Sequence, residues 1–130
     1  MAEMSNFLEN ALLNATLNAT TYTAPATVYV SLWTSDPTDA GSGTEVSGGS
    51  YARTAVSFAT ASGTSGNVLN DADVTFPTAT ASWGVVGWIG INDAATSGNL
   101  LYHTALDTSK TIDSGDIFKI STGNLSVTLA

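Results

Sequence analysis

The stretch WGVVGWIGIN, residues 83–92, is apolar or glycine at every position but the last, and it decides how the rest of the chain must pack. Side chains along a strand alternate between its two faces. One face would carry the alternate residues Trp83, Val85, Gly87, Ile89 and Ile91. The other face would carry Val86 and Trp88. Because both faces are apolar, we predict a strand in the middle of the structure, covered on both sides.

The stretch ATVYVSLWT, residues 26–34, shows a different pattern, typical of a strand with one aliphatic face. Aliphatic residues fall at every second position and polar or aromatic residues fall between them: Val28, Val30 and Leu32 against Tyr29, Ser31 and Trp33. This alternation is expected of a strand that packs on one side of a sandwich.

From Thr20 onward the chain is rich in threonine, with Val and Ile runs separated by Gly, Ser or Asp clusters, which favours strands. Further runs bounded by turn residues lie at 51–59, 73–76, 100–106, 116–121 and 125–129. Short turns at residues 113–116 and 122–124 predict that the last strands pair as sequential antiparallel hairpins. About seven short antiparallel strands predict a mainly β fold, a single β-sandwich or jelly-roll-like domain.

Residues 6–18 are predicted to form an N-terminal α-helix. Asn6 can cap its first turn, and the side chain of Glu9, three residues later, can hydrogen-bond back to the backbone N–H of Asn6. At helical spacing one apolar stripe would comprise Phe7, Leu8, Ala11, Leu12 and Ala15. Leu13 and Leu17 would lie on a nearly opposite stripe. Either the helix lies in a groove of its own domain with these two leucines half exposed, or it lies at a subunit contact. The chain thus divides into an N-terminal helix or arm, residues 1–20, and a β-sandwich domain, residues 21–130.

The charge balance restricts the partners. A chain of 130 residues fits one domain, and 11 acidic residues against Arg53, Lys110 and Lys119 give a net charge of −8. With no basic patch, we expect neither nucleic acid nor a membrane surface as a partner.

The chain has no cysteine, which excludes disulfides and thiolate metal sites. Residues 1–9 carry acids but no Lys or Arg, the reverse of a secretory signal, which predicts assembly in the cytoplasm.

The segment from Asp36 to Ser50, with Pro37 and four glycines, is long for a hairpin loop in so small a domain. Its acidic residues Asp36, Asp39 and Glu45 could offer oxygen ligands to a hard cation such as calcium. Their spacing matches no calcium-loop motif, and turn chemistry already explains an Asp-Pro step followed by glycines. We therefore predict neither metal nor cofactor, with a calcium site as the alternative.

No pattern in the chain indicates catalysis. His103, the only histidine, has no serine or acid beside it in sequence, and no Gly-x-Ser-x-Gly motif occurs, so a structural role is expected. Asp71 and Asp73 could form an acid–base pair, but charges that protect a sheet edge explain them better. The glycine clusters lack the lysine and the strand-to-helix setting of a phosphate loop. We therefore expect no enzymatic activity.

Aromatic residues suggest one rival function. Three tryptophans and two tyrosines could form a platform that stacks sugars, as in β-sandwich carbohydrate-binding modules: Trp33, Trp83, Trp88, Tyr29 and Tyr51. However, Trp83 and Trp88 fall on opposite faces of one predicted strand, and large aromatics in a small domain are more often core residues or interface anchors.

Several separated blocks of sequence carry a family resemblance. The first strand and the segment behind it contribute residues 28–33 (VYVSLW), 36–39 (DPTD), 45–49 (EVSGG) and 51–53 (YAR). Further blocks are residues 5–10, 73–77, 92–95, 98–101 and 125–129. Over nearly its whole length the chain resembles a family of short bacteriophage virion proteins that are often labelled tail fibre proteins. None of these blocks is a catalytic signature.

The resemblance implies a non-enzymatic component of the virion, assembled in the cytoplasm of the bacterial host. The chain lacks the long repeated or trimeric shaft of a fibre, so its size favours a capsid cement or decoration protein. Such proteins lie on the capsid surface over junctions between capsid subunits, often as dimers or trimers. The expected partners are then the major capsid protein and copies of this chain, which stabilise the assembled shell by mass action. The alternatives are a tail or tail-fibre component that contacts the host, and a small carbohydrate-binding or hydrolytic module.

The helix and the segment from Asp36 to Arg53 are the predicted partner contacts. The residues are Phe7, Leu8, Leu12, Leu13, Leu17, Asp36, Asp39, Glu45 and Arg53. Arg53, the only arginine, could bind a neighbour's carboxylate through a bidentate fork. An ion pair within the chain is the alternative.

Overall fold

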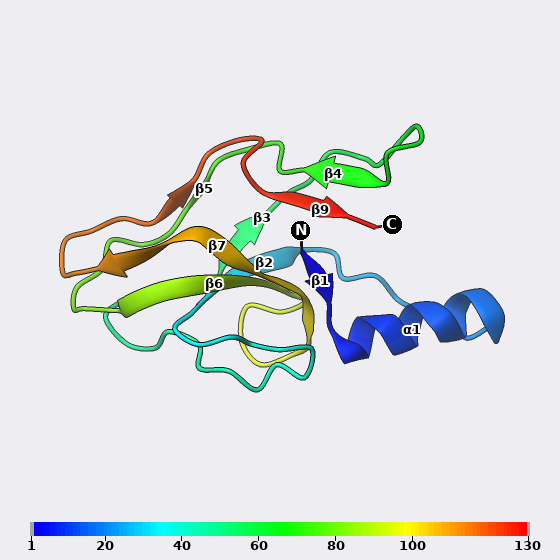
Figure 1. The fold of residues 1–130 in the computed structure, drawn as a ribbon, viewed down its shortest axis with the longest axis horizontal. Coiled ribbons are helices and arrows are strands. Elements are labelled where there is room, and N and C mark those ends of the chain that lie inside the picture. The colour runs from blue at the N-terminus through cyan, green and yellow to red at the C-terminus, as the bar shows by residue number, and fades with distance from the viewer. Residues whose placement is uncertain (1, 130) are drawn as a thin grey trace.

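The computed structural model describes residues 2–129 as a mainly β protein with one N-terminal helix, as predicted (Figure 1). In chain order the elements are β1 (Glu3–Met4), α1 (Asn6–Leu17), β2 (Val28–Trp33), β3 (Thr54–Val56), β4 (Asn67–Leu69), β5 (Val74–Thr75), β6 (Gly84–Asn92), β7 (Leu100–Ile112), β8 (Lys119–Ile120) and β9 (Ser126–Thr128).

Five strands form one antiparallel sheet in the order β1-β7-β6-β2-β3, and the remaining four form two antiparallel pairs, β4-β9 and β5-β8. In Figure 1 these pairs lie over one side of the large sheet. Buried side chains from both layers form one core, in which Val30 and Leu32 of the large sheet join Phe76, Phe118 and Val127 from the smaller pairs. The arrangement is that of a sandwich, and β6 lies at the centre of the large sheet as its apolar sequence predicted.

The core is built from the aliphatic face of β2 and the aromatic residues that flank β5 and β8. Val30 and Leu32 are completely buried, as their alternation with Tyr29 and Ser31 predicted. In the second layer, the rings of Phe76 and Phe118 meet edge to face, with centroids 5.6 Å apart. Aromatic pairs in this geometry add stability beyond the area they bury.

The two faces of β6 differ from the prediction. Val85 is 53% exposed, whereas Val86 is fully buried in the same core as Ile89 and Ile91. The cause is an irregularity in the pairing with β7, where Val86 pairs with Lys110 but Trp88 pairs with Ala105. A bulge of this kind shifts the alternation of side chains by one position, which moves Val86 to the core face.

The last strands do not form the sequential hairpins that their short turns predicted. β8 pairs with β5 and β9 pairs with β4, while β7 pairs with β6 and β1. These pairings place β8 and β9 in the second layer, and Phe118 and Val127 join the core from there. The short strands β1 and β4 were not predicted, and β7 runs to Ile112 rather than ending near Leu106.

Asn70, which follows β4, is a fully buried polar residue that joins three segments of the second layer. Its side-chain amide donates to the carbonyls of Ala72 and Ser121 at 2.9 and 3.1 Å, and its side-chain oxygen accepts from the N–H of Leu125 at 2.9 Å. Both N–H donors and the oxygen of the amide are used, so Asn70 joins segments whose strands are too short to pair with one another extensively.

Replacing Asn70 with alanine should lower the free energy of unfolding by about 2–4 kcal/mol, because two carbonyls and one N–H lose their partner. Urea unfolding followed by tryptophan fluorescence measures this loss. The exposed Asn124 provides the control, since Asn124→Ala should change the same quantity by no more than about 0.5 kcal/mol. Equal losses in the two variants would contradict the role given to the Asn70 amide.

Candidate functional site

The first turn of α1 is fastened to the large sheet by Ser5. The hydroxyl of Ser5 accepts the N–H of Leu8 at 3.2 Å and donates to the carbonyl of Leu100 in β7. Ser5 is therefore the N-cap, one residue before the predicted Asn6. The backbone N–H of Ser5 also donates to the carbonyl of Leu101, at 2.8 Å.

Beyond this turn α1 extends away from both layers, as Figure 1 shows. Leu8 is buried and Leu12 half-buried, while Leu13 is 54% and Leu17 75% exposed. Phe7, expected on the packed stripe, is also exposed. The helix thus has an outward apolar surface comprising Leu13 and Leu17, which no part of residues 2–129 covers.

The segment after β2 folds back onto the sheet instead of extending as a free loop. The N–H of Val46 donates to the carbonyl of Leu32, and the N–H of Thr34 to that of Thr44, both at 2.9 Å. Glu45 forms an isolated bridge with Trp33. Asp39 accepts the N–H of Asn6 through its backbone carbonyl at 2.9 Å, which joins the segment to the first turn of α1.

The helix and the segment, predicted separately as contact regions, therefore meet. They line a hollow of about 470 Å³ together with the turn before β7. Its walls include Phe7, Trp33, Asp39, Arg53 and Leu100.

Arg53 and Glu45 form an ion pair within the chain. The guanidinium donates from Nε and Nη2 to the two carboxylate oxygens of Glu45, at 2.9 and 2.8 Å. Its Nη1 donates to the carbonyls of Ala94 and Ser97, at 3.0 and 2.8 Å. These hydrogen bonds to Glu45 raise the pKa of the Arg53 guanidinium. The structure thus has the ion pair within the chain that was the alternative for Arg53. A contact between Arg53 and a partner's carboxylate stays a prediction.

Tyr51 completes this network beneath the segment. Its phenol donates to Glu45 at 2.6 Å and accepts the N–H of Leu32 at 3.0 Å. Burial raises the pKa of the Tyr51 phenol, and the bond to Glu45 raises it further. The phenol therefore stays protonated at neutral pH, where it holds Glu45 against β2.

Asp36 and Asp39 do not join Glu45 in a cation site, as the calcium alternative required. Both lie beside His103 of β7, whose Nε2 is 2.8 Å from the Oδ1 of Asp39. Glu3 also approaches this ring, because β1 pairs Glu3 directly opposite His103. Sequence analysis missed Glu3 and His103 as site residues, since a two-residue strand has no periodic pattern that could have predicted this pairing.

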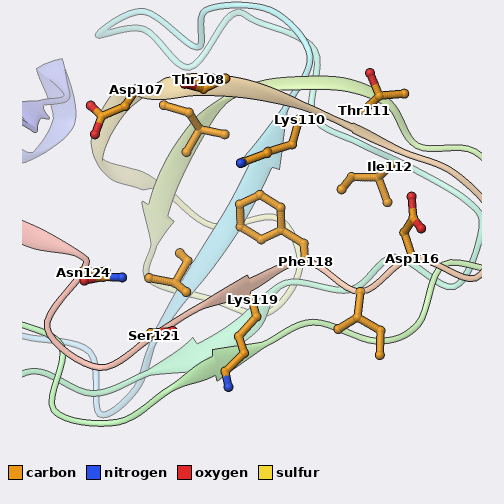
Figure 2. A pocket seen from close by; sticks show the side chains of 13 residues that line it. Asp107, Thr108, Lys110, Thr111, Ile112, Asp116, Phe118, Lys119, Ser121 and Asn124 are labelled. Atoms are coloured by element: carbon orange, nitrogen blue, oxygen red, sulfur yellow. The ribbon is translucent and has the colours of Figure 1, made fainter.

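A second hollow, of about 690 Å³, lies between the outer half of β7 and the segment around β8 (Figure 2). Phe118 and Ile112 lie in its wall near Lys110 and Asp116 (Figure 2). The lining includes neither a histidine nor a pair of carboxylates arranged for acid–base chemistry.

Asp71 and Asp73 have separate partners. Asp73 accepts the backbone N–H and hydroxyl of Thr122 and lies 3.2 Å from Lys119, and these contacts, the Thr122 N–H first, lower the pKa of its carboxyl. Asp71 accepts from the hydroxyl of Ser57. The two carboxyls therefore anchor neighbouring segments instead of sharing a proton.

The tryptophans do not form an exposed row. Trp33 and Trp83 are buried, and their indole N–H groups donate to the Ser31 hydroxyl and the Gly49 carbonyl, at 2.8 and 2.9 Å. Trp88 is half-buried. A sugar-stacking platform needs several neighbouring aromatic faces open to solvent, which this arrangement does not provide.

Residues 3–128 match the model of the family described as podophage GP4 fiber I protein gp80. No curated protein matches the chain. In residues 2–129 the helix is too short and too polar to cross a membrane.

Replacing Arg53 with lysine should lower the free energy of unfolding by about 1–3 kcal/mol, because an ammonium cannot bind both Glu45 oxygens and two carbonyls at once. Chemical unfolding measures the loss. The reverse exchange at an exposed position of β7, Lys110→Arg, is the control and should change stability by no more than about 0.5 kcal/mol. An unchanged Arg53→Lys variant would show that the fork does not stabilise the segment.

Proposed function

This chain belongs to the podophage GP4 fiber I protein gp80 family, and we propose that it is a non-enzymatic fibre subunit of a bacteriophage particle. Membership of this family makes it a structural protein of the virion. The family description supports a place in a fibre, whereas the size of the chain favours a cement protein on the capsid surface. In either placement the protein acts through the surfaces that it packs against other subunits.

The outward surface of α1 is the observation that supports assembly as the function. Leu13 and Leu17 lie one turn apart on α1, and their side chains are 54% and 75% exposed. Leaving two leucines in water stabilises nothing, whereas covering them in an interface contributes the free energy of apolar burial. We therefore assign α1 to a subunit contact.

The charge distribution favours a second copy of this chain as the occupant of that surface. Copies that each carry a net charge of −8 repel one another. Residues 10–17 of α1 carry no charged side chain, so this is a place where two copies can approach with little repulsion. Association through the helices would give the dimer or trimer expected of a virion subunit.

Counting the copies of this protein in purified particles distinguishes the two placements. A fibre subunit should be present in a few to a few dozen copies, because a particle has one tail. Quantitative mass spectrometry against the major capsid protein gives the number. Hundreds of copies would contradict the fibre placement and support the cement protein, and complete absence would contradict a structural role in the virion.

The double variant Leu13→Gln/Leu17→Gln should convert the oligomer into a monomer, because the apolar surface of α1 is lost. Size-exclusion chromatography with light scattering measures the mass. The control Asn10→Gln/Asn14→Gln introduces the same residues on the same helix and should keep the oligomer. Both double variants should unfold within about 0.5 kcal/mol of the parent subunit, because all four side chains are exposed. A parent protein that is already monomeric at high concentration would contradict self-association through α1.

A further inference from the structure

We propose that Glu3, Asp39 and His103 bind one divalent transition-metal ion of the Zn²⁺ type, beside the first turn of α1. Each residue offers one ligand atom, and the three atoms lie within 4.8 Å of one another. A metal held by nitrogen and oxygen at about 2.0–2.2 Å separates its ligands by up to about twice that distance. The three side chains therefore need only small rotations to meet a common ion.

The three ligands come from different segments that backbone hydrogen bonds already hold together. β1 pairs Glu3 opposite His103, which places both side chains on the same face of the sheet. The bond from the N–H of Asn6 to the Asp39 carbonyl brings the loop residue to the same place. A site that is assembled before the metal arrives loses little conformational entropy on binding.

His103 has the environment of a metal-binding histidine. It is only 6% exposed, and its Nε2 lies 2.8 Å from Asp39 Oδ1 and 4.0 Å from Glu3 Oε2. The other ring nitrogen, Nδ1, lies 4.0 Å from Asp36 Oδ1, and that oxygen is held by the N–H of Thr38 at 2.9 Å. Metal-bound histidines usually donate a hydrogen bond from the second ring nitrogen to a carboxylate, a backbone carbonyl or a water. Asp36 is the carboxylate placed to take this role, although at 4.0 Å it must move closer to accept the bond.

The charges around His103 also favour a cation. Three carboxylates, from Glu3, Asp36 and Asp39, converge on one imidazole. In residues 2–129, Arg53 and Lys119 form their ion pairs elsewhere, with Glu45 and Asp73. A divalent ion would offset this negative charge. The imidazole nitrogen favours Zn²⁺ or a similar transition metal over calcium, which prefers ligands that are all oxygen.

The test is a titration of the chelator-treated full chain with ZnCl₂, by isothermal calorimetry and by NMR of the imidazole. We expect one Zn²⁺ per chain. Because the chain has a single histidine, its ¹⁵N signals report the site directly, and the Nε2 signal should shift strongly while Nδ1 stays protonated.

Substitutions identify the ligands. Glu3→Gln should weaken Zn²⁺ binding at least about tenfold. Glu3 is 72% exposed, so this variant keeps the fold even if Asp39→Asn or His103→Gln does not. The control Asp107→Asn removes an exposed carboxylate from the same strand and should bind Zn²⁺ as the parent chain does.

Two results would overturn the proposal. One is no saturable binding of Zn²⁺ to the parent chain. The other is equal binding by the parent chain and Glu3→Gln with no shift of the His103 signal. Either result would leave the His103–Asp39 contact as a hydrogen bond that joins β7 to the segment after β2.

Discussion

Trp33 and Leu100 pack closely over Gly90 at the centre of the large sheet. The N-terminus and the loop after β2, which carry the candidate sites, are placed around this contact. A Cβ atom on Gly90 would lie 2.7 Å from Leu100 Cδ1 and 3.0 Å from Trp33 Nε1, so a larger residue would push these side chains off the sheet. With glycine there, the outer face of the central strands can be covered as well as the core face. A sheet covered on both faces needs segments from elsewhere in the chain to cover it.

Those segments are the N-terminus and the loop after β2, and their position explains both proposals. Ser5 fastens the start of α1 to β7, which leaves the rest of the helix directed away from the sandwich with Leu13 and Leu17 exposed. Glu3 in the edge strand β1 and Asp39 in the loop after β2 both reach His103 in β7. The proposed metal site therefore lies at the base of the helix that carries the assembly surface, and an ion that joins β1 to the loop would also stiffen that base.

Local patterns in the sequence predicted where the helix and most strands lie better than which strands pair with one another. The N-terminal helix, the central position of β6 and the buried aliphatic face of β2 follow from periodicity alone. The faces of β6 could not be predicted, because the bulge beside Gly87 arises from the pairing with β7. The same holds for β8 and β9, which bypass their nearest neighbours in sequence to pair with β5 and β4.

By itself the sequence determined the class of protein: a mainly β fold with an apolar helix, and a family resemblance spread over many short blocks. These properties depend on residue type and spacing, which the chain carries before it folds. Only the tertiary structure decided that Arg53 binds Glu45, and that Glu3, Asp39 and His103 converge. Glu3, Asp39 and His103 lie far apart in sequence and meet only when the chain has folded. Arg53 and Glu45 are close in sequence, but their ion pair depends on the segment after β2 folding back onto the sheet.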